Sequence, residues 1–247
     1  GVSLDPPRVE YKAQPGGTIN ATINVFNPGA KGGPPLQVST AFNDWILNGE
    51  GKMNYLAPGS LPNSLASWIT LAPVSFGLEG NADRDVRYSV KVPANTKPGL
   101  YWGVVFFKSD SGKEDVFRPT TAKGGVSVDY KIDVGQLIYV QVGPPKLEGK
   151  LTKIVGKQGA NGLQIAANLN NTGNSLIRAA GTVELRNLKG EKVASSEIEE
   201  GATLPGFTRT YTTGFKTAVP KGEYLALVAL EYQKGKFYTG ESRIKVE

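Results

Sequence analysis

The chain has 247 residues, of which 39% are hydrophobic, and it carries a formal net charge of +6. It contains neither cysteine nor histidine, which excludes disulfides, thiolate nucleophiles, cysteine-ligated metals and every mechanism that needs an imidazole base. The acidic pairs, such as Asp83 with Asp85, fall in turns or on polar strand faces. We therefore predict a protein that is not an enzyme and that has no metal or cofactor site.

The positive charge is concentrated in the second half of the chain. Residues 146–247 carry 15 lysines and arginines against 10 acidic residues, whereas residues 1–145 carry 13 against 12. The lysines are spaced singly, which favours a solvated surface, with an acidic cell-wall polymer as the alternative. No basic stripe with interleaved aromatic residues suggests nucleic acid, and no run approaches the roughly 18 to 20 apolar residues of a membrane span.

Hydrophobic residues alternate with polar ones along most of the chain, and no long window shows helical spacing, so the sequence predicts an all-β protein. Glycine and proline are frequent, with 31 and 16 residues, as expected for many strands joined by turns. In the first half, the predicted strands are residues 18–27, 36–47, 68–70, 84–92 and 100–108. In the second half, they are residues 163–169, 180–186, 193–197, 209–214, 224–232 and 237–246. Residues 48–67 are expected to form an inserted loop.

Two sequence echoes indicate an internal repeat. Asn27-Pro28-Gly29 and Asn171-Thr172-Gly173 each end an early strand, and Tyr101 and Tyr224 each follow a glycine by two residues at the start of a late strand. A tyrosine at this place forms the tyrosine corner of Greek-key sandwiches. The sequence therefore predicts two tandem immunoglobulin-like Greek-key β-sandwiches, residues 1–143 with an insertion near residues 48–67, and residues 144–247.

Residues 126–142 form the longest alternating stretch. Val126, Val128, Tyr130 and Ile132 alternate with polar residues, and the whole stretch is too long for one ordinary strand. We expect it to bend or break at Gly135, so that its first part becomes the last strand of the first domain. The alternating row either faces its own core or lies on an edge that pairs with a strand of another protein.

The beginning of the chain adds a family resemblance. Gly1-Val2-Ser3-Leu4-Asp5 followed by Arg8 is similar to the first strand of the fimbrial, or pilus-assembly, chaperones of the bacterial periplasm. Residues 67–70 and 99–103 resemble a broader set of secreted chaperone-like proteins that includes the WxL-interacting proteins. The resemblance implies that Arg8 and Lys131 hold the terminal carboxylate of a pilus subunit. It also implies that the alternating row of residues 126–132 is lent to that subunit.

The leading functional hypothesis is a non-enzymatic chaperone or adaptor of the cell envelope that binds a partner by strand addition at the first domain. An alternative is a structural subunit of a pilus, surface layer or other fibre, in which the same edge pairs with further copies. A third hypothesis is a cell-wall carbohydrate-binding module that uses Trp45, Trp68 or Trp102. The chain opens directly on strand-like sequence, as a mature chain does after signal removal, so we expect a periplasmic or cell-surface location.

Overall fold

The computed structural model describes residues 1–110 and 133–247 of the chain. Every regular element in this part is a β-strand, and none of the described residues forms a helix with the length and hydrophobicity that a membrane crossing requires. The chain divides into two compact units. One comprises Gly1–Trp45, Tyr55–Lys97 and Tyr101–Gly143, and the other comprises Ile46–Asn54, Pro98–Leu100 and Pro144–Glu247. We propose residues 1–143 and 144–247 as the two folding domains.

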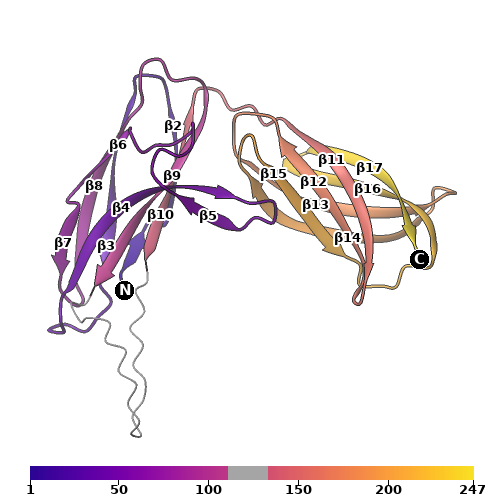
Figure 1. The fold of residues 1–247 in the computed structure, drawn as a ribbon, viewed down its shortest axis with the longest axis horizontal. Helices are drawn as coiled ribbons and strands as arrows, with labels where there is room; N and C mark the ends of the chain where they lie inside the picture. The colour runs from indigo at the N-terminus through magenta and orange to yellow at the C-terminus, as the bar shows by residue number, and fades with distance from the viewer. Residues whose placement is uncertain (111–132) are drawn as a thin grey trace, which may run out of the picture. The chain divides into compact units, whose positions relative to one another are not determined.

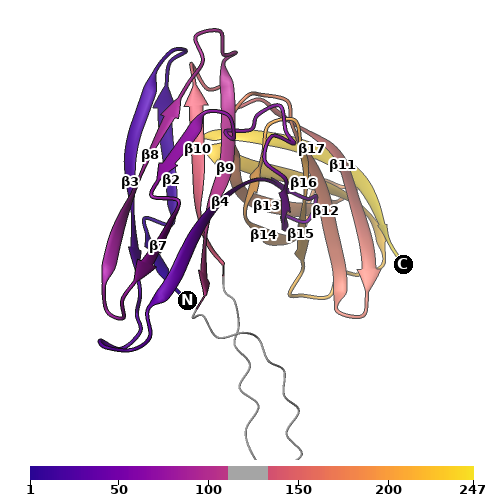
Figure 2. The same ribbon diagram turned by 60° about the vertical axis from the view of Figure 1, so that its left-hand side comes forward.

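The first unit is a sandwich of two sheets, and Figure 2 shows β3 and β8 in one layer and β9 and β10 in the other. The four-stranded sheet has the order β1 (Ser3–Asp5), β3 (Thr18–Phe26), β8 (Asp83–Lys91) and β6 (Ile69–Ala72). The other sheet has the order β2 (Arg8–Ala13), β10 (Val134–Val142), β9 (Gly99–Asp110), β4 (Leu36–Leu47) and β5 (Met53–Leu56), with β7 (Ser75–Leu78) also paired to β4.

The second unit is a sandwich of a three-stranded and a four-stranded sheet (Figure 1). The three-stranded sheet has the order β11 (Gly149–Gly159), β12 (Gly162–Asn171) and β15 (Thr208–Gly214). The four-stranded sheet has the order β14 (Lys192–Thr203), β13 (Ile177–Asn187), β16 (Gly222–Gln233) and β17 (Lys236–Val246). The prediction of an all-β chain with two immunoglobulin-like sandwiches is thus confirmed.

Each sandwich has its own hydrophobic core, because alternate residues of its strands face the opposite sheet. Ile23 and Val25 of β3 lie in the same core as Phe107 of β9. In the second unit, Ile165 of β12 lies in the same core as Leu230 of β16. The alternation in the sequence therefore corresponds to the inward and outward faces of the strands.

The two asparagines of the repeat make equivalent hydrogen bonds. The Asn27 side chain accepts a hydrogen bond from Gly29 N at 2.9 Å, and that of Asn171 accepts one from Gly173 N at 3.1 Å. Both side chains are buried, and their Nδ2 groups donate to backbone carbonyls, that of Leu78 for Asn27 and those of Ser175 and Thr203 for Asn171. Each asparagine therefore fixes the turn that follows the second core strand of its sandwich.

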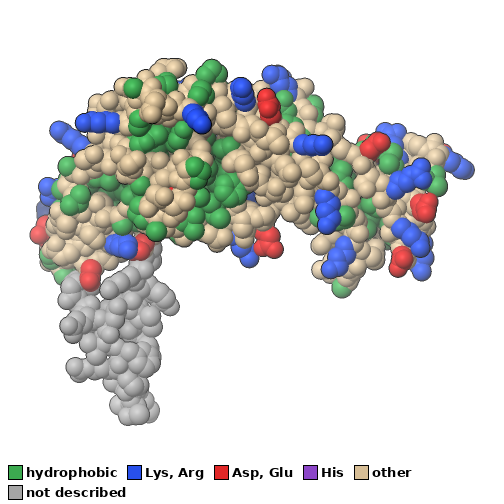
Figure 3. All heavy atoms as spheres, turned by 45° about the horizontal axis from the view of Figure 1, so that its top comes forward, with side chains coloured by type: hydrophobic (Ala, Val, Ile, Leu, Met, Phe, Trp, Pro, Cys, Tyr) green, Lys and Arg blue, Asp and Glu red, His purple; other side chains and the backbone are tan. Residues whose placement is uncertain are grey.

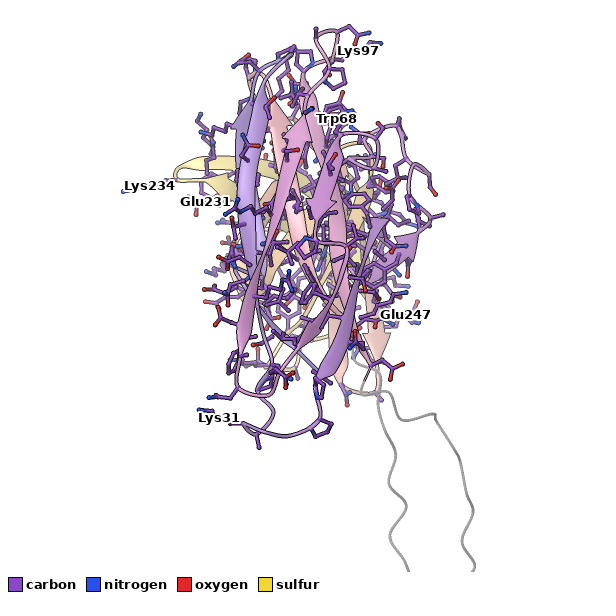
Figure 4. The ribbon with its side chains drawn as sticks, turned by 90° about the vertical axis from the view of Figure 1, so that its left-hand side faces the viewer. Lys31, Trp68, Lys97, Glu231, Lys234 and Glu247 are labelled. Atoms are coloured by element: carbon purple, nitrogen blue, oxygen red, sulfur yellow. The ribbon has the colours of Figure 1, made fainter. Side chains whose placement is uncertain are left out.

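The predicted tyrosine corners are also present in both units. Tyr101 Oη donates to Lys97 O at 3.1 Å, and Tyr224 Oη donates to Pro220 O at 2.6 Å. Lys97 lies at the opposite end of the first sandwich from Lys31 (Figure 4). The matched bonds confirm that both sandwiches follow the same plan.

Parts of the chain between the predicted strands proved to be regular as well. The expected loop at residues 48–67 contains β5, which extends the larger sheet beyond β4. β11 is a further strand that was not predicted, and its pairing with β12 shifts register between Leu151 and Lys153. This bulge interrupts the alternation on which the prediction depended.

Candidate functional site

Arg8 is the first residue of β2, and its side chain is exposed. The strand runs parallel to β10, with Arg8 opposite Leu137. No hydrogen bond or ion pair joins its guanidinium group to another residue of the described part. Arg8 is therefore a cation available to an external partner.

The chain changes sheets immediately before Arg8. Asp5 ends β1, which pairs with β3, whereas β2 pairs with β10 in the other sheet. The crossing is held by Gln136, whose Nε2 donates to Pro6 O at 2.7 Å, and by Leu137, whose N donates to Pro7 O at 3.0 Å. Because proline has no N–H group, neither Pro6 nor Pro7 can donate to a neighbouring strand.

This crossing leaves one edge of β10 open. The pairing with β2 covers β10 only from Leu137 to Val142. Since Leu137 directs its N–H toward the β2 side, Gly135, two residues earlier, presents its N–H and C=O to the same side. Among residues 1–110 and 133–247, no strand pairs with Gly135 there. An unpaired stretch of backbone thus adjoins Arg8.

Tyr11 fixes the position of β2 from inside the sandwich. Its hydroxyl lies 2.6 Å from the hydroxyl of Tyr88 on β8 of the opposite sheet. Burial raises the pKa of Tyr88 well above its ordinary value, and the hydrogen bond between Tyr88 and Tyr11 raises it further. The Tyr88 hydroxyl therefore stays protonated at neutral pH, and its hydrogen bond with Tyr11 ties β2 to the other layer, which holds Arg8 in register with β10.

The remaining predicted site residues, Lys131 and the row Val126, Val128, Tyr130 and Ile132, lie outside the described residues. Of the bend or break expected at Gly135, the break is excluded, because β10 continues through Gly135 and Gln136 to Val142. The row has the same parity as Ile138, Val140 and Val142, which face the core. In the sequence, the row of residues 126–132 therefore has the same alternation as the core-facing residues of β10, which is already part of the sheet.

The face of β10 that adjoins Arg8 carries residues that the sequence analysis did not single out. Leu137, Tyr139 and Gln141 lie opposite Arg8, Glu10 and Lys12 of β2. β10 contains no lysine, so Arg8 has no cationic neighbour on its own partner strand. Tyr139 is instead buried against Trp45, with ring centroids 5.7 Å apart.

Two of the three tryptophans proposed for carbohydrate binding, Trp45 and Trp102, are buried in the sandwich, whereas Trp68 is half-buried. Trp45 is 0% and Trp102 is 1% exposed, and Trp102 Nε1 donates to Trp45 O at 2.7 Å. Trp68 packs on Tyr101 at a centroid distance of 4.3 Å. Trp45 and Trp102 thus present no ring face on which a sugar could stack.

The larger part of the inserted segment, residues 55–67, belongs to the unit that carries the site. The buried carboxylate of Asp44 accepts hydrogen bonds from Leu61 N at 2.9 Å and Ser64 Oγ at 2.6 Å. Leu65, also from this segment, is fully buried in the core. The signal in the sequence was Asp44, the one charged residue of β4, since a buried charge needs nearby donors.

Comparison with solved structures shows that the fold is shared with fimbrial chaperones. The crystal structure of the class 5 fimbriae chaperone CfaA superposes with a TM-score of 0.53, at 14% identity and with 100% of both chains covered. A chain of the CsuC–CsuE chaperone–tip adhesion subunit pre-assembly complex of Acinetobacter baumannii gives a TM-score of 0.51, at 13% identity and with 100% of both chains covered. A chain of a chaperone–tip adhesin complex of CFA/I fimbriae biogenesis gives a TM-score of 0.51, at 10% identity, with 99% of this chain and 98% of that chain covered.

No family model and no curated protein matches the chain by sequence. At identities of 10% to 14%, the likeness is one of fold. It extends over both sandwiches and confirms the chaperone-like architecture that the first residues of the chain suggested.

Proposed function

We propose that this chain is a non-enzymatic chaperone or adaptor of the bacterial cell envelope that binds a partner protein by β-strand addition at the open edge of β10. The observation that carries the proposal is the unpaired backbone at Gly135, directly before β2 begins to cover β10 and beside the exposed Arg8. A strand that paired with β10 at this edge would lie end to end with β2, on the same side of β10.

The sequence and the chemistry of the edge support this mode of binding. Main-chain hydrogen bonds to Gly135 and the residues before it would supply affinity that grows with the length of the paired segment. The alternating row of Val126, Val128, Tyr130 and Ile132 would present apolar side chains to an incomplete core of the partner. A sandwich that lacks a strand exposes such a core, so both components would gain buried apolar area.

Arg8 is suited to fix the end of the added strand. A polypeptide that ended beside Leu137 would bring its terminal carboxylate close to the guanidinium group of Arg8, which forms short, charge-assisted hydrogen bonds with carboxylates. Lys131 precedes Leu137 by six residues, which span about 20 Å in an extended strand. We therefore propose Arg8 as the principal cation and Lys131 as a second contact farther along the partner.

The fold comparison supports a proposal for the partner class and the compartment. The matched structures include a chaperone of fimbriae and complexes of chaperones with tip subunits. We accordingly propose a pilus or surface subunit as the partner and the periplasm or cell surface as the location. The alternative, a fibre subunit, would use the same edge to pair with copies of itself.

Purification of the tagged full chain from its native envelope tests this proposal. A chaperone or adaptor is expected as a monomer together with a defined complex of one chain and one captured protein, measured by light scattering and mass spectrometry. Assembly of the purified chain into fibres, with no second protein, would establish the structural-subunit alternative instead.

A further inference from the structure

The outer face of the three-stranded sheet in the second unit has an ordered set of polar side chains. Residues opposite one another on β11, β12 and β15 form cross-strand rows, each beginning with a lysine on the edge strand β11. These rows are Lys150–Asn170–Thr208, Lys153–Asn168–Thr210 and Lys157–Gln164–Gly214. Val155, Ala166 and Thr212 form a row between the second and the third.

The charge on this face has one sign. None of the outward residues of β11, β12 and β15 is acidic, and Lys150, Lys153 and Lys157 are exposed. No ion pair joins these lysines to another residue of the described part. On the other sheet of the same unit, by contrast, Glu184 forms ion pairs with Arg186 and Lys192.

Carboxylates lie only at the margins of the face. On the β15 side, Glu197, Glu199 and Glu200 of β14 line a pocket together with Thr210, Thr212 and Gly214. Glu148 directly precedes β11. Glu50 belongs to the segment Ile46–Asn54 of the second unit and lies next to Gly49, whose carbonyl accepts a hydrogen bond from Thr210 N at 2.7 Å. Glu50 is therefore at the β15 side of the sheet, whereas the lysines lie on the opposite edge strand.

The asparagines beside the lysines are oriented as donors. Asn170 Oδ1 accepts a hydrogen bond from Thr208 Oγ1 at 2.8 Å, and Asn168 Oδ1 accepts one from Thr210 Oγ1 at 2.9 Å. These bonds occupy the amide oxygens and leave both Nδ2 groups without a partner in the described part. Each of the first two rows thus combines an ammonium group with amide N–H groups fixed by a threonine.

We propose that this face binds an extended polyol-phosphate or sugar-phosphate polymer. Lys150 and Lys153 stand two register positions apart, which corresponds to about 7 Å along a strand, and Lys157 lies about twice that distance farther on. A polymer with regularly spaced phosphates complements such a row of ammonium groups, while the amide donors suit its hydroxyl oxygens. The face carries no aromatic side chain, so it lacks the stacking platform that single-stranded nucleic acid uses. This inference does not depend on the function proposed for the first unit.

Binding of poly(glycerol phosphate) to the full chain tests the inference, with the affinity measured by calorimetry at low and at physiological salt. The wild-type chain is expected to bind, and added salt is expected to weaken the binding. The triple variant Lys150→Gln, Lys153→Gln, Lys157→Gln should lose about tenfold in affinity. Each exposed ion pair contributes only modestly to the binding free energy, and the tenfold loss is the sum over the three lysines. Thermal unfolding of the variant should match that of the wild-type chain, which excludes misfolding as the cause.

A matched control variant distinguishes binding at this face from a general effect of the net charge of the chain. The triple variant Lys189→Gln, Lys221→Gln, Lys234→Gln removes the same charge from exposed turns of the same unit. Lys234 lies near Glu231 at the tip of the β16–β17 hairpin (Figure 4). Figure 3 shows how widely lysine and arginine are distributed over this unit. The control should bind within about twofold of the wild-type chain. Equal losses in both variants, absence of wild-type binding, or equally tight binding of oligothymidylate or polygalacturonate would each overturn the inference.

Discussion

Leu137 donates its backbone N–H to the carbonyl oxygen of Pro7 at 3.0 Å, and this hydrogen bond marks the point where β2 begins to cover β10. On the N-terminal side of this bond, the chain that precedes β2 crosses to the opposite sheet and pairs with β3. The start of β2 at Arg8 and the open edge of β10 thus arise from the same crossing. Arg8, beside this bond, stands where an added strand would meet β2.

Arg8→Ala should weaken partner capture without destabilising the sandwich. Arg8 is exposed and has no partner in the described part, so its loss should change the free energy of unfolding by less than about 0.5 kcal/mol. Lys12→Ala is the matched control, because Lys12 is an exposed cation on the same face of β2. Pull-down yields should fall for Arg8→Ala and stay unchanged for Lys12→Ala. A large stability loss in Arg8→Ala would show that Arg8 is structural.

Asn27→Ala and Asn171→Ala should each destabilise their own sandwich by at least about 2 kcal/mol, because both leave buried backbone groups without hydrogen bonds. The three tryptophans, Trp45, Trp68 and Trp102, all belong to the first unit. Urea unfolding followed by tryptophan fluorescence should therefore shift for Asn27→Ala, and far-ultraviolet circular dichroism should reveal the loss in Asn171→Ala. The exposed Asn95 provides a control, since Asn95→Ala should change neither transition.

Tyr224→Phe should destabilise the second sandwich by about 1 to 2 kcal/mol, because it removes the donor to the Pro220 carbonyl at the tyrosine corner. Tyr101→Phe should have a smaller effect, since the bond of Tyr101 to Lys97 is longer and exposed. The two losses can be compared by urea denaturation of the full chain. Equal effects, or a larger loss in Tyr101→Phe, would contradict the assignment.

The stability of the first sandwich should fall at alkaline pH. The pKa of Tyr88 is raised in the folded chain by burial and by Tyr11, whereas in the unfolded chain it is about 10. The folded state therefore holds the Tyr88 proton more tightly than the unfolded state does. The resulting stabilisation of the first sandwich is complete below pH 10 and declines above pH 10 by up to about 1.4 kcal/mol per pH unit. Urea unfolding between pH 8 and 11 should show this decline and a shallower one for Tyr88→Phe. Identical slopes would refute the role of Tyr88.

The sequence predicted those parts of the fold that depend on local pattern. Alternation located most core strands, and the echoes at Asn27, Asn171, Tyr101 and Tyr224 revealed the repeat because each residue makes a hydrogen bond to a backbone group close by in its own sandwich. The bulge after Leu151 concealed β11, since one extra residue reverses the alternation.

Features that depend on long-range contacts were harder to predict. No break occurs at Gly135, because β10, which is paired with β9, continues through this residue where local propensity favoured an interruption. For the candidate site, the family resemblance of the first residues pointed to Arg8, and its exposure is visible only in the structure. The aromatic environment of Tyr139 depends on Trp45, which is distant in sequence. The open edge of β10 depends on where another strand, β2, begins to pair with it.

Hydrogen exchange at the backbone amide of Gly135 tests the central claim most directly. The measurement compares the free chain with the complex that it forms with its captured envelope protein, using the amide of Leu137 as the internal reference. We predict that Leu137 is protected in both states, whereas Gly135 exchanges rapidly in the free chain and slowly in the complex. Rapid exchange of Gly135 in both states would show that no strand is added at this edge.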